Sequence, residues 1–378
     1  MTGAAAPDYP AGAERAAASG LAAGGNGVIA GDLLAGRNLS LDFFRGVMAL
    51  LVAIGHFYYW NAYIKIPLSF ILAVDFFLVL SGFVICHSVT RQKDKFDSIS
   101  FAKKRWLRLF PVYIACVLIT VPPVLWYKNL DGPNLFDMAR IITISQMIPL
   151  NSGSHFPLIE PLGIAYTISA ELWTGIFLFP LYSFLLTGFK NLVFPVFMLL
   201  IIWALIILNN EPGNNFMNIH HWLYGQFLDY AVIRCIFDYS IGILAYIIFS
   251  RSRNMPISAF LSSAQLVCII AWFLIYCKFD YIRNNEFLAP FLFTFFIYLL
   301  SFKAGVVYKI TATRFAAFLG DISYPAYLIH PFWIFILQLY RANVHKAYIV
   351  LLYLFVLISS AWLINRLVEK PCLKLLRK

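Results

Sequence analysis

Ten apolar segments, each about as long as a helix that crosses a membrane, limit the fold of this chain most strongly. Of its 378 residues, 61% are hydrophobic and 12% are charged, whereas soluble proteins carry about 25% charged residues. The sequence therefore predicts an all-α, polytopic transmembrane helical bundle of about ten helices within residues 41–371. The segments lie near residues 43–61, 69–89, 109–127, 165–187, 191–208, 227–250, 257–277, 286–303, 321–340 and 347–368, and a shorter one at 136–149 is expected to be interfacial or re-entrant.

Lysine and arginine are distributed unequally between alternate connections of these segments. Twenty of the 29 lie on the side that holds the N-terminus, and seven lie on the opposite side. Because cytoplasmic loops carry the excess of Lys and Arg, we expect both termini in the cytoplasm. This asymmetry accounts for the net charge of +11 without a nucleic-acid partner.

The regions outside the segments are short or of biased composition. Residues 1–40 are rich in Ala and Gly and are expected to be a disordered cytoplasmic extension. They lack the basic and apolar regions of a cleavable signal peptide. Residues 372–378 form an expected cytoplasmic basic tail. The six cysteines have no paired or metal-like spacing, so we expect packing roles for them and no disulfide framework.

The first segment contains an arginine and a histidine, which are costly at membrane depth and usually serve a function there. Arg45 and His56 are eleven residues apart, so a helix places them on one face and roughly 16 Å apart along its axis. Asp42 lies on the same side, one turn before Arg45. With the expected topology, Arg45 lies near the cytoplasmic end and His56 lies farther outward.

A basic stretch precedes the third segment. Arg105 and Arg108 are spaced i, i+3 and share one helical face. Their guanidinium groups suit bidentate binding of phosphate. Alternatively, the cluster anchors the helix to anionic lipid headgroups. We favour lipid contact for the neighbouring Lys103 and Lys104, and phosphate binding for the two arginines.

Two carboxylates are expected near the depth of His56. Asp75 stands in the second segment, six residues before Ser81, and Glu171 enters the fourth segment two residues after Ser169. Either carboxylate would orient an imidazole, accept a proton or hold a sugar hydroxyl. The alternatives are an interfacial position for Asp75 and a stabilising ion pair between Glu171 and a cation such as Arg234.

A second intramembrane histidine, His330, follows Ser323 and Tyr324 in the ninth segment. It is either catalytic or a structural hydrogen-bond donor. Arg234 and Asp238 are spaced i, i+4 and favour a structural ion pair. The remaining histidines match no metal-binding spacing, and we expect no metal site; these are His87, His155, His220, His221 and His345.

Five motifs in one order resemble acyltransferase family 3, a family of bacterial integral-membrane O-acyltransferases, from about Leu41 to Pro371. The motifs are Arg45 with His56, Asp75-Phe-Phe with Ser81-Gly82-Phe83, Arg105-x-x-Arg108 with Pro111, Ser169-x-Glu171, and Ser323-Tyr324 with His330. The sequence departs from the family at Tyr166-Thr167, where Trp-Ser is commoner. The chain ends soon after the last segment, so we expect no fused SGNH-type hydrolase domain.

The resemblance implies transfer of an acyl group, expected to be acetyl, from cytoplasmic acetyl-CoA to a hydroxyl of an envelope or exported carbohydrate. It implies catalytic roles for His56, Glu171 and Asp75, and donor binding by Arg45, Arg105 and Arg108. We expect supporting roles for His330, Tyr324, Ser169, Asp42 and Ser81.

The implied setting is the bacterial inner membrane, with membrane lipids and a carbohydrate acceptor as partners. The acceptor would be a polysaccharide, a lipid-linked oligosaccharide or lipopolysaccharide, and a homo-oligomer is compatible with the sequence. His56 would act as a general base or would carry the acyl group itself. The alternative function is a transporter or flippase of a glycan, although the paired broken helices of such proteins are not evident.

Overall fold

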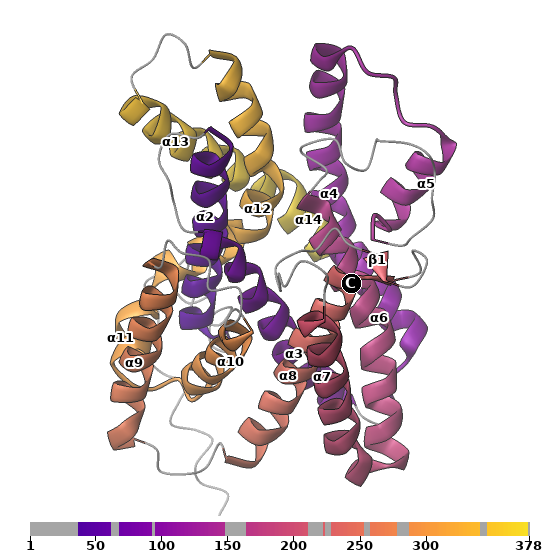
Figure 1. The fold of residues 1–378 in the computed structure, drawn as a ribbon, viewed down its shortest axis with the longest axis vertical. Helices are drawn as coiled ribbons and strands as arrows, with labels where there is room; N and C mark the ends of the chain where they lie inside the picture. The colour runs from indigo at the N-terminus through magenta and orange to yellow at the C-terminus, as the bar shows by residue number, and fades with distance from the viewer. Residues whose placement is uncertain are drawn as a thin grey trace, which may run out of the picture. The chain divides into compact units, whose positions relative to one another are not determined.

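The computed structural model describes residues 37–61, 68–92, 95–147, 164–210, 222–223, 228–252, 258–277, 287–340 and 346–376. The expected N-terminal extension therefore lies outside the described residues up to residue 36, as do His155, His220, His221 and His345. The described helices belong to one compact unit, Leu39–Lys378 (Figure 1).

The described part of the chain is built almost entirely from helices, which confirms the predicted fold class. They are α2 (Leu39–Asn61), η1 (Leu68–Leu72), α3 (Ala73–Gln92), α4 (Ser98–Lys128), α5 (Leu135–Thr143), α6 (Ala165–Gly188), η5 (Lys190–Leu192), α7 (Val193–Asn209), α8 (Tyr230–Ser252), α9 (Ser258–Cys277), α10 (Leu288–Ser301), α11 (Val306–Thr311), α12 (Arg314–Tyr340), α13 (Lys346–Ile364), η7 (Asn365–Glu369) and α14 (Lys370–Leu375). Two-residue strands, β1 (Trp222–Leu223) and β2 (Leu228–Asp229), pair antiparallel before α8.

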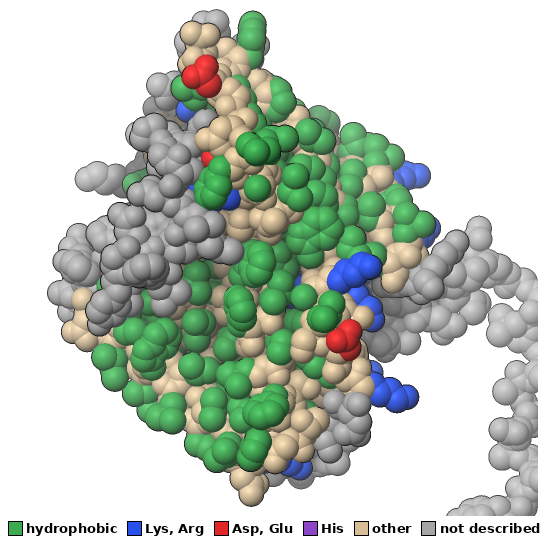
Figure 2. Space-filling view, turned by 90° about the vertical axis from the view of Figure 1, so that its right-hand side faces the viewer, with side chains coloured by type: hydrophobic (Ala, Val, Ile, Leu, Met, Phe, Trp, Pro, Cys, Tyr) green, Lys and Arg blue, Asp and Glu red, His purple; other side chains and the backbone are tan. Residues whose placement is uncertain are grey.

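Nine helices within the described ranges are long and apolar enough to cross a membrane, and α10 is a shorter apolar helix of 14 residues. Figure 2 shows one face of the molecule covered largely by hydrophobic side chains. Such a surface suits contact with lipid acyl chains. The chain is therefore a multi-pass membrane protein. The side on which its termini lie stays a prediction.

Two helices begin earlier than the hydropathy pattern predicted. α4 begins at Ser98 rather than near residue 109, because Asp97 caps it by accepting from the backbone N–H groups of Ile99 and Ser100. α12 begins at Arg314 rather than near residue 321. Charged first turns are helical but lower the local hydropathy. Arg105 and Arg108 consequently lie inside a helix of 31 residues.

α2 and α12 run parallel in close contact, side by side in Figure 1. Arg45 of α2 donates to Ser323 of α12, and His56 contacts His330 farther along the same pair. Gly46 and Gly320 permit this approach, because a Cβ on Gly46 would lie 2.4 Å from Leu319 Cβ. A Cβ on Gly320 would lie 2.6 Å from Asp42 Cβ. The helices α2, α4 and α12 begin at one end of the bundle, and this end carries Arg45, Arg105 and Arg108. We call it the basic end.

Candidate active site

The centre of the candidate site is a hydrogen-bonded pair of histidines from α2 and α12. His56 Nδ1 lies 3.1 Å from His330 Nε2, and His330 Nδ1 lies 2.7 Å from the carbonyl oxygen of Tyr327. His330 is completely buried and His56 is partly buried. The sequence predicted both histidines as site residues but did not predict their contact.

The hydrogen bonds assign the tautomers of the pair. Because a carbonyl oxygen only accepts, His330 Nδ1 carries the proton, and neutral His330 then accepts at Nε2. His56 therefore donates from Nδ1 to His330. In neutral His56, the remaining nitrogen Nε2 carries a lone pair, and it has no hydrogen-bond partner among the described residues. The arrangement therefore leaves one basic nitrogen, His56 Nε2, available to accept a proton.

Two aromatic rings, one from α2 and one from η1, pack against His56. The Trp60 indole is stacked on His56 at a centroid distance of 4.6 Å, and Phe70 meets His56 edge-on at 5.0 Å. Trp60 was missed as a site residue at the sequence level. Its position four residues after His56, on the same helical face, was the available signal.

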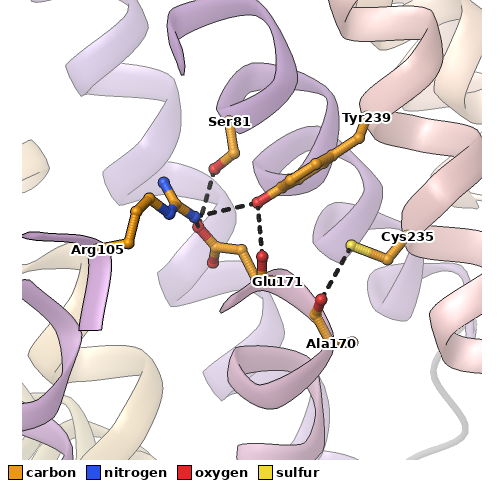
Figure 3. Close-up of polar contacts among 6 residues, drawn as sticks. All are labelled: Ser81, Arg105, Ala170, Glu171, Cys235 and Tyr239. Atoms are coloured by element: carbon orange, nitrogen blue, oxygen red, sulfur yellow. Dashed lines mark hydrogen bonds and ion pairs between the residues drawn. The ribbon is translucent and has the colours of Figure 1, made fainter. Parts of the chain in front are cut away.

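A second cluster joins four helices around Glu171 (Figure 3). Arg105 Nη2 donates to Glu171 Oε1 at 3.0 Å and to the Tyr239 hydroxyl at 3.2 Å. Ser81 also donates to Glu171 Oε1, at 3.1 Å, and Tyr239 donates to the Glu171 carbonyl oxygen. Glu171 is thus bonded to Arg105 rather than to Arg234 or to His56. Tyr239 had not been singled out, because a tyrosine in an apolar helix has no distinctive sequence signal.

The two arginines of the i, i+3 pair differ in their surroundings. The Arg105 side chain is 10% exposed and bonded to Glu171. Arg108 is exposed and makes no hydrogen bond or ion pair within 4 Å of another described residue. Arg108 interacts electrostatically with Arg45, Arg105, Glu171 and Glu369. Arg108 is therefore the more available of the two for an anion.

Arg45 lies at the same end of the bundle. The Arg45 side chain is 28% exposed, and its Nη1 lies 3.4 Å from Asp42 Oδ1. Its Nη2 donates to the Ser323 hydroxyl at 3.3 Å. Glu369 belongs to the π-helical turn η7, whose Asn365 donates both to Glu369 and to the carbonyl oxygen of Asp321. Such turns are common at functional sites. Arg45 and Arg108 give the basic end two partly available guanidinium groups.

Asp75 lies apart from His56 and is bonded to Arg234 of α8. Arg234 Nε and Nη2 donate to the two Asp75 oxygens at 2.6 and 2.7 Å, and both side chains are buried. Asp238 lies beside them with both carboxyl oxygens buried and no hydrogen-bond partner in the described structure. Arg234 is therefore bonded to Asp75, and no hydrogen bond joins it to Asp238, the intrahelical partner that the sequence predicted.

The other predicted supporting residues hold helices together. Ser169 accepts from the backbone N–H of Met147, which follows α5, and so fixes that segment against α6. Tyr324 donates to the carbonyl oxygen of Leu109 and links α12 to α4. Trp173 donates to the carbonyl oxygen of Ile144 and also holds the segment after α5.

Asp229, which lies outside the membrane-spanning helices, has a raised pKa. Burial raises the pKa of Asp229, at the start of α8, to about 7, although Ala231 N–H donates to this carboxylate at 2.7 Å. Within the described ranges, no group of three or more His, Cys, Asp or Glu side chains is arranged to hold a metal ion.

The chain belongs to acyltransferase family 3, whose model, described as an acyltransferase domain, matches residues 38–366. The fold and the family together define a multi-pass membrane protein of an acyltransferase family. A relative from Rhizobium radiobacter, named protein 2 in picA locus, is 34% identical over 109 residues. That match covers 28% of this chain and 56% of the relative, so the chain spans about half of the relative's length. No solved structure matches the chain.

Proposed function

We propose that this acyltransferase moves an acyl group, expected to be acetyl, from acyl-CoA to a hydroxyl of an envelope or exported carbohydrate. The observation that carries the proposal is the His56–His330 pair, which leaves His56 Nε2 available as a base. Transfer to a hydroxyl needs a base for the acceptor and a binding site for the large anionic donor.

The arginines at the basic end support binding of the donor there. Coenzyme A carries several phosphates, and guanidinium groups bind phosphate oxygens well. Arg45 and Arg108 are the candidates for this contact, whereas Arg105 is engaged by Glu171. Because Arg45 and His56 are roughly 16 Å apart along α2, an extended pantetheine arm would bridge the arginines and the imidazole.

The distribution of basic residues supports an orientation for this path. If the basic end faces the cytoplasm, as the positive-inside rule predicts, acyl-CoA enters from the cytoplasm and the acceptor meets His56 from the opposite side. The bacterial inner membrane satisfies this requirement, because acyl-CoA is cytoplasmic and envelope carbohydrates lie outside.

In the proposed reaction, His56 Nε2 removes the proton of the acceptor hydroxyl while the oxygen attacks the thioester carbonyl. The new C–O bond forms, the C–S bond breaks, and the departing thiolate takes the proton from His56. The products are the O-acylated acceptor and free coenzyme A. No net proton is released or consumed.

The tautomers favour a general base over an acyl carrier. A neutral acyl-imidazole on His56 would require the Nδ1 proton to move to His330, which is completely buried and already protonated at Nδ1. That step would leave a cation on the more buried ring. When His56 Nε2 instead takes up a proton, the positive charge forms on His56, which is the more accessible of the two rings, and this cost is avoided.

Mass spectrometry of cell-surface and exported glycans tests this function and identifies the acyl group. Cells without the gene should lack a mass increment of one acyl group on one glycan, and the intact gene should restore it. A His56→Gln variant should not restore it. Identical glycan masses in cells with and without the gene would contradict the proposed acceptor class.

A further inference from the structure

The indole of Trp60 is stacked on His56 and lies nearly parallel to the more distant His330. Its ring plane is inclined by 22° to His56 and by 16° to His330, at centroid distances of 4.6 and 6.4 Å. The two imidazole planes are inclined by only 9°, their centroids are 5.2 Å apart, and a hydrogen bond of 3.1 Å joins His56 Nδ1 to His330 Nε2. They therefore lie nearly edge to edge, and one face of the indole runs parallel to the plane that holds their shared proton.

No described carboxylate makes a hydrogen bond or ion pair with His56. The two carboxylates expected at its depth are engaged elsewhere, Asp75 by Arg234 and Glu171 by Arg105. The partner of His56 Nδ1 is a neutral imidazole. Among the described residues, a proton taken up during catalysis would thus leave a cation without a carboxylate of the kind that supports histidine in many hydrolases.

The face of an indole attracts cations through its negative quadrupole, and tryptophan is the strongest of the aromatic side chains in this respect. We propose that Trp60 stabilises the positive charge that forms on the His56–His330 pair during acyl transfer, in place of a carboxylate. This inference rests on the proposed function of His56 as the base. Trp60 is then a positioning residue with an electrostatic effect, and it does not touch the reacting atoms.

The surrounding helices hold Trp60 and His56 in register. Gln338 of α12 donates to the Trp60 carbonyl oxygen at 3.3 Å, one turn after His56. Tyr353 of α13, which is completely buried, donates to the Ala53 carbonyl oxygen at 3.0 Å, one turn before His56. The contact between indole and imidazole is therefore fixed from both neighbouring helices.

Several titratable groups on the helices packed against α2 bear on this charge. His330 and Tyr327 belong to α12, Tyr353 to α13 and Asp75 to α3. The hydroxyls of Tyr327 and Tyr353 are bonded to Thr167 and to a backbone carbonyl, and Asp75 is bonded to Arg234. Among these groups, only His330 shares a hydrogen-bonded proton with His56.

The test compares Trp60→Phe and Trp60→Leu with a matched control, Trp126→Leu. Trp126 is 85% exposed on α4 and stands for an interfacial tryptophan without a catalytic role. Radiolabelled acetyl-CoA is given to inverted membrane vesicles from cells that lack the chromosomal gene and express each variant. The rate of label transfer to glycan is measured from pH 3 to pH 9, so that the acidic limb is included, and melting temperatures in detergent report folding.

We expect Trp60→Leu to lower the maximal rate roughly 3- to 30-fold, with Trp60→Phe in between and Trp126→Leu unchanged. Because a destabilised cation makes His56 harder to protonate, the acidic limb of the rate profile should move to lower pH, by roughly 0.5 to 1.5 units. If both Trp60 variants have the maximal rate of the wild type and an acidic limb at the same pH, the proposal is overturned. A lower rate with an unmoved limb would also overturn it, since that pattern indicates packing alone. If Trp60→Leu does not fold, Trp60→Phe decides by the same two measures.

A His56→Gln variant separates this proposal from the proposed function. Retained transfer in His56→Gln would reject His56 as the base, and with it the role of Trp60, but would leave the acyl transfer itself in place. Loss of transfer in His56→Gln, together with a wild-type profile in the Trp60 variants, would reject only the role of Trp60.

Discussion

The buried ion pair between Asp75 and Arg234 decides whether Asp75 is structural or catalytic. Its two hydrogen bonds measure 2.6 and 2.7 Å, and the side chains are 0% and 4% exposed. Removing one partner of such a pair leaves an uncompensated buried charge and costs about 3–5 kcal/mol. In Arg234→Met this cost falls on Asp75, with the unbonded carboxyl of Asp238 beside it.

Removing both charges should recover most of this loss. Apolar replacement of a buried ion pair is often neutral or stabilising, so Asp75→Leu with Arg234→Met should be more stable than Arg234→Met alone. The exposed pair of Lys370 and Asp321, at 2.9 Å and 54% and 24% exposed, provides the control. Lys370→Met should cost no more than about 1 kcal/mol.

The assay is unfolding of the purified protein by titration with SDS in mixed micelles, followed by acyl transfer at equal amounts of folded protein. We expect the double variant to fold and to retain transfer. An Arg234→Met variant within about 1 kcal/mol of the wild type would refute the energetic reasoning. A folded double variant without transfer would instead restore Asp75 to the catalytic role that the sequence predicted.

Three further predictions concern charged residues. Burial raises the pKa of Asp229 to about 7, so the folded protein binds more protons than the unfolded chain between about pH 4 and that value. Stability should therefore fall as pH rises through this range, by at most about 1.4 kcal/mol per pH unit, and Asp229→Asn should remove the fall in melting temperature. Arg108→Gln should raise the KM for acyl-CoA roughly 10- to 100-fold without loss of stability, whereas Arg105→Gln should destabilise the fold by breaking its bond to Glu171.

Each of these predictions has an outcome that contradicts it. A melting temperature that rises from pH 4 to pH 7 in the wild type, or falls equally in Asp229→Asn, would reject the role of Asp229. An unchanged KM for acyl-CoA in Arg108→Gln would contradict donor binding by Arg108 and favour the alternative, contact with anionic lipid headgroups. An Arg105→Gln variant as stable as the wild type would show that its bond to Glu171 is dispensable.

Hydropathy alone predicted the fold well, because every expected span contains a helix. The hydropathy pattern did not predict where several of the helices begin and end. The first turns of α4 carry Lys103, Lys104 and Arg105, and charged turns look like loops in a hydropathy window even when a residue such as Asp97 caps the helix. The short α10 shows the opposite error, since an apolar run of spanning length forms a helix of only 14 residues.

The candidate site was predictable as residues but not as contacts. The spacing of Arg45 and His56 follows from helix geometry alone. The contact of His56 with His330 depends on α2 and α12 lying parallel at the closeness that Gly46 and Gly320 permit. The sequence offers several arginines and carboxylates of similar depth, and helical periodicity does not specify their partners. The pairings of Asp75 and Glu171 therefore came only from the packing of the helices.

Acyl transfer by a His56→Gln variant tests the central claim most directly. Label transfer from radiolabelled acetyl-CoA is followed in inverted vesicles that contain equal amounts of folded wild-type or variant protein. Loss of a general base lowers the rate roughly 10²- to 10⁴-fold, and we expect a loss in this range with an unchanged melting temperature. Transfer by His56→Gln within a few-fold of the wild-type rate would contradict the assignment of His56 as the base.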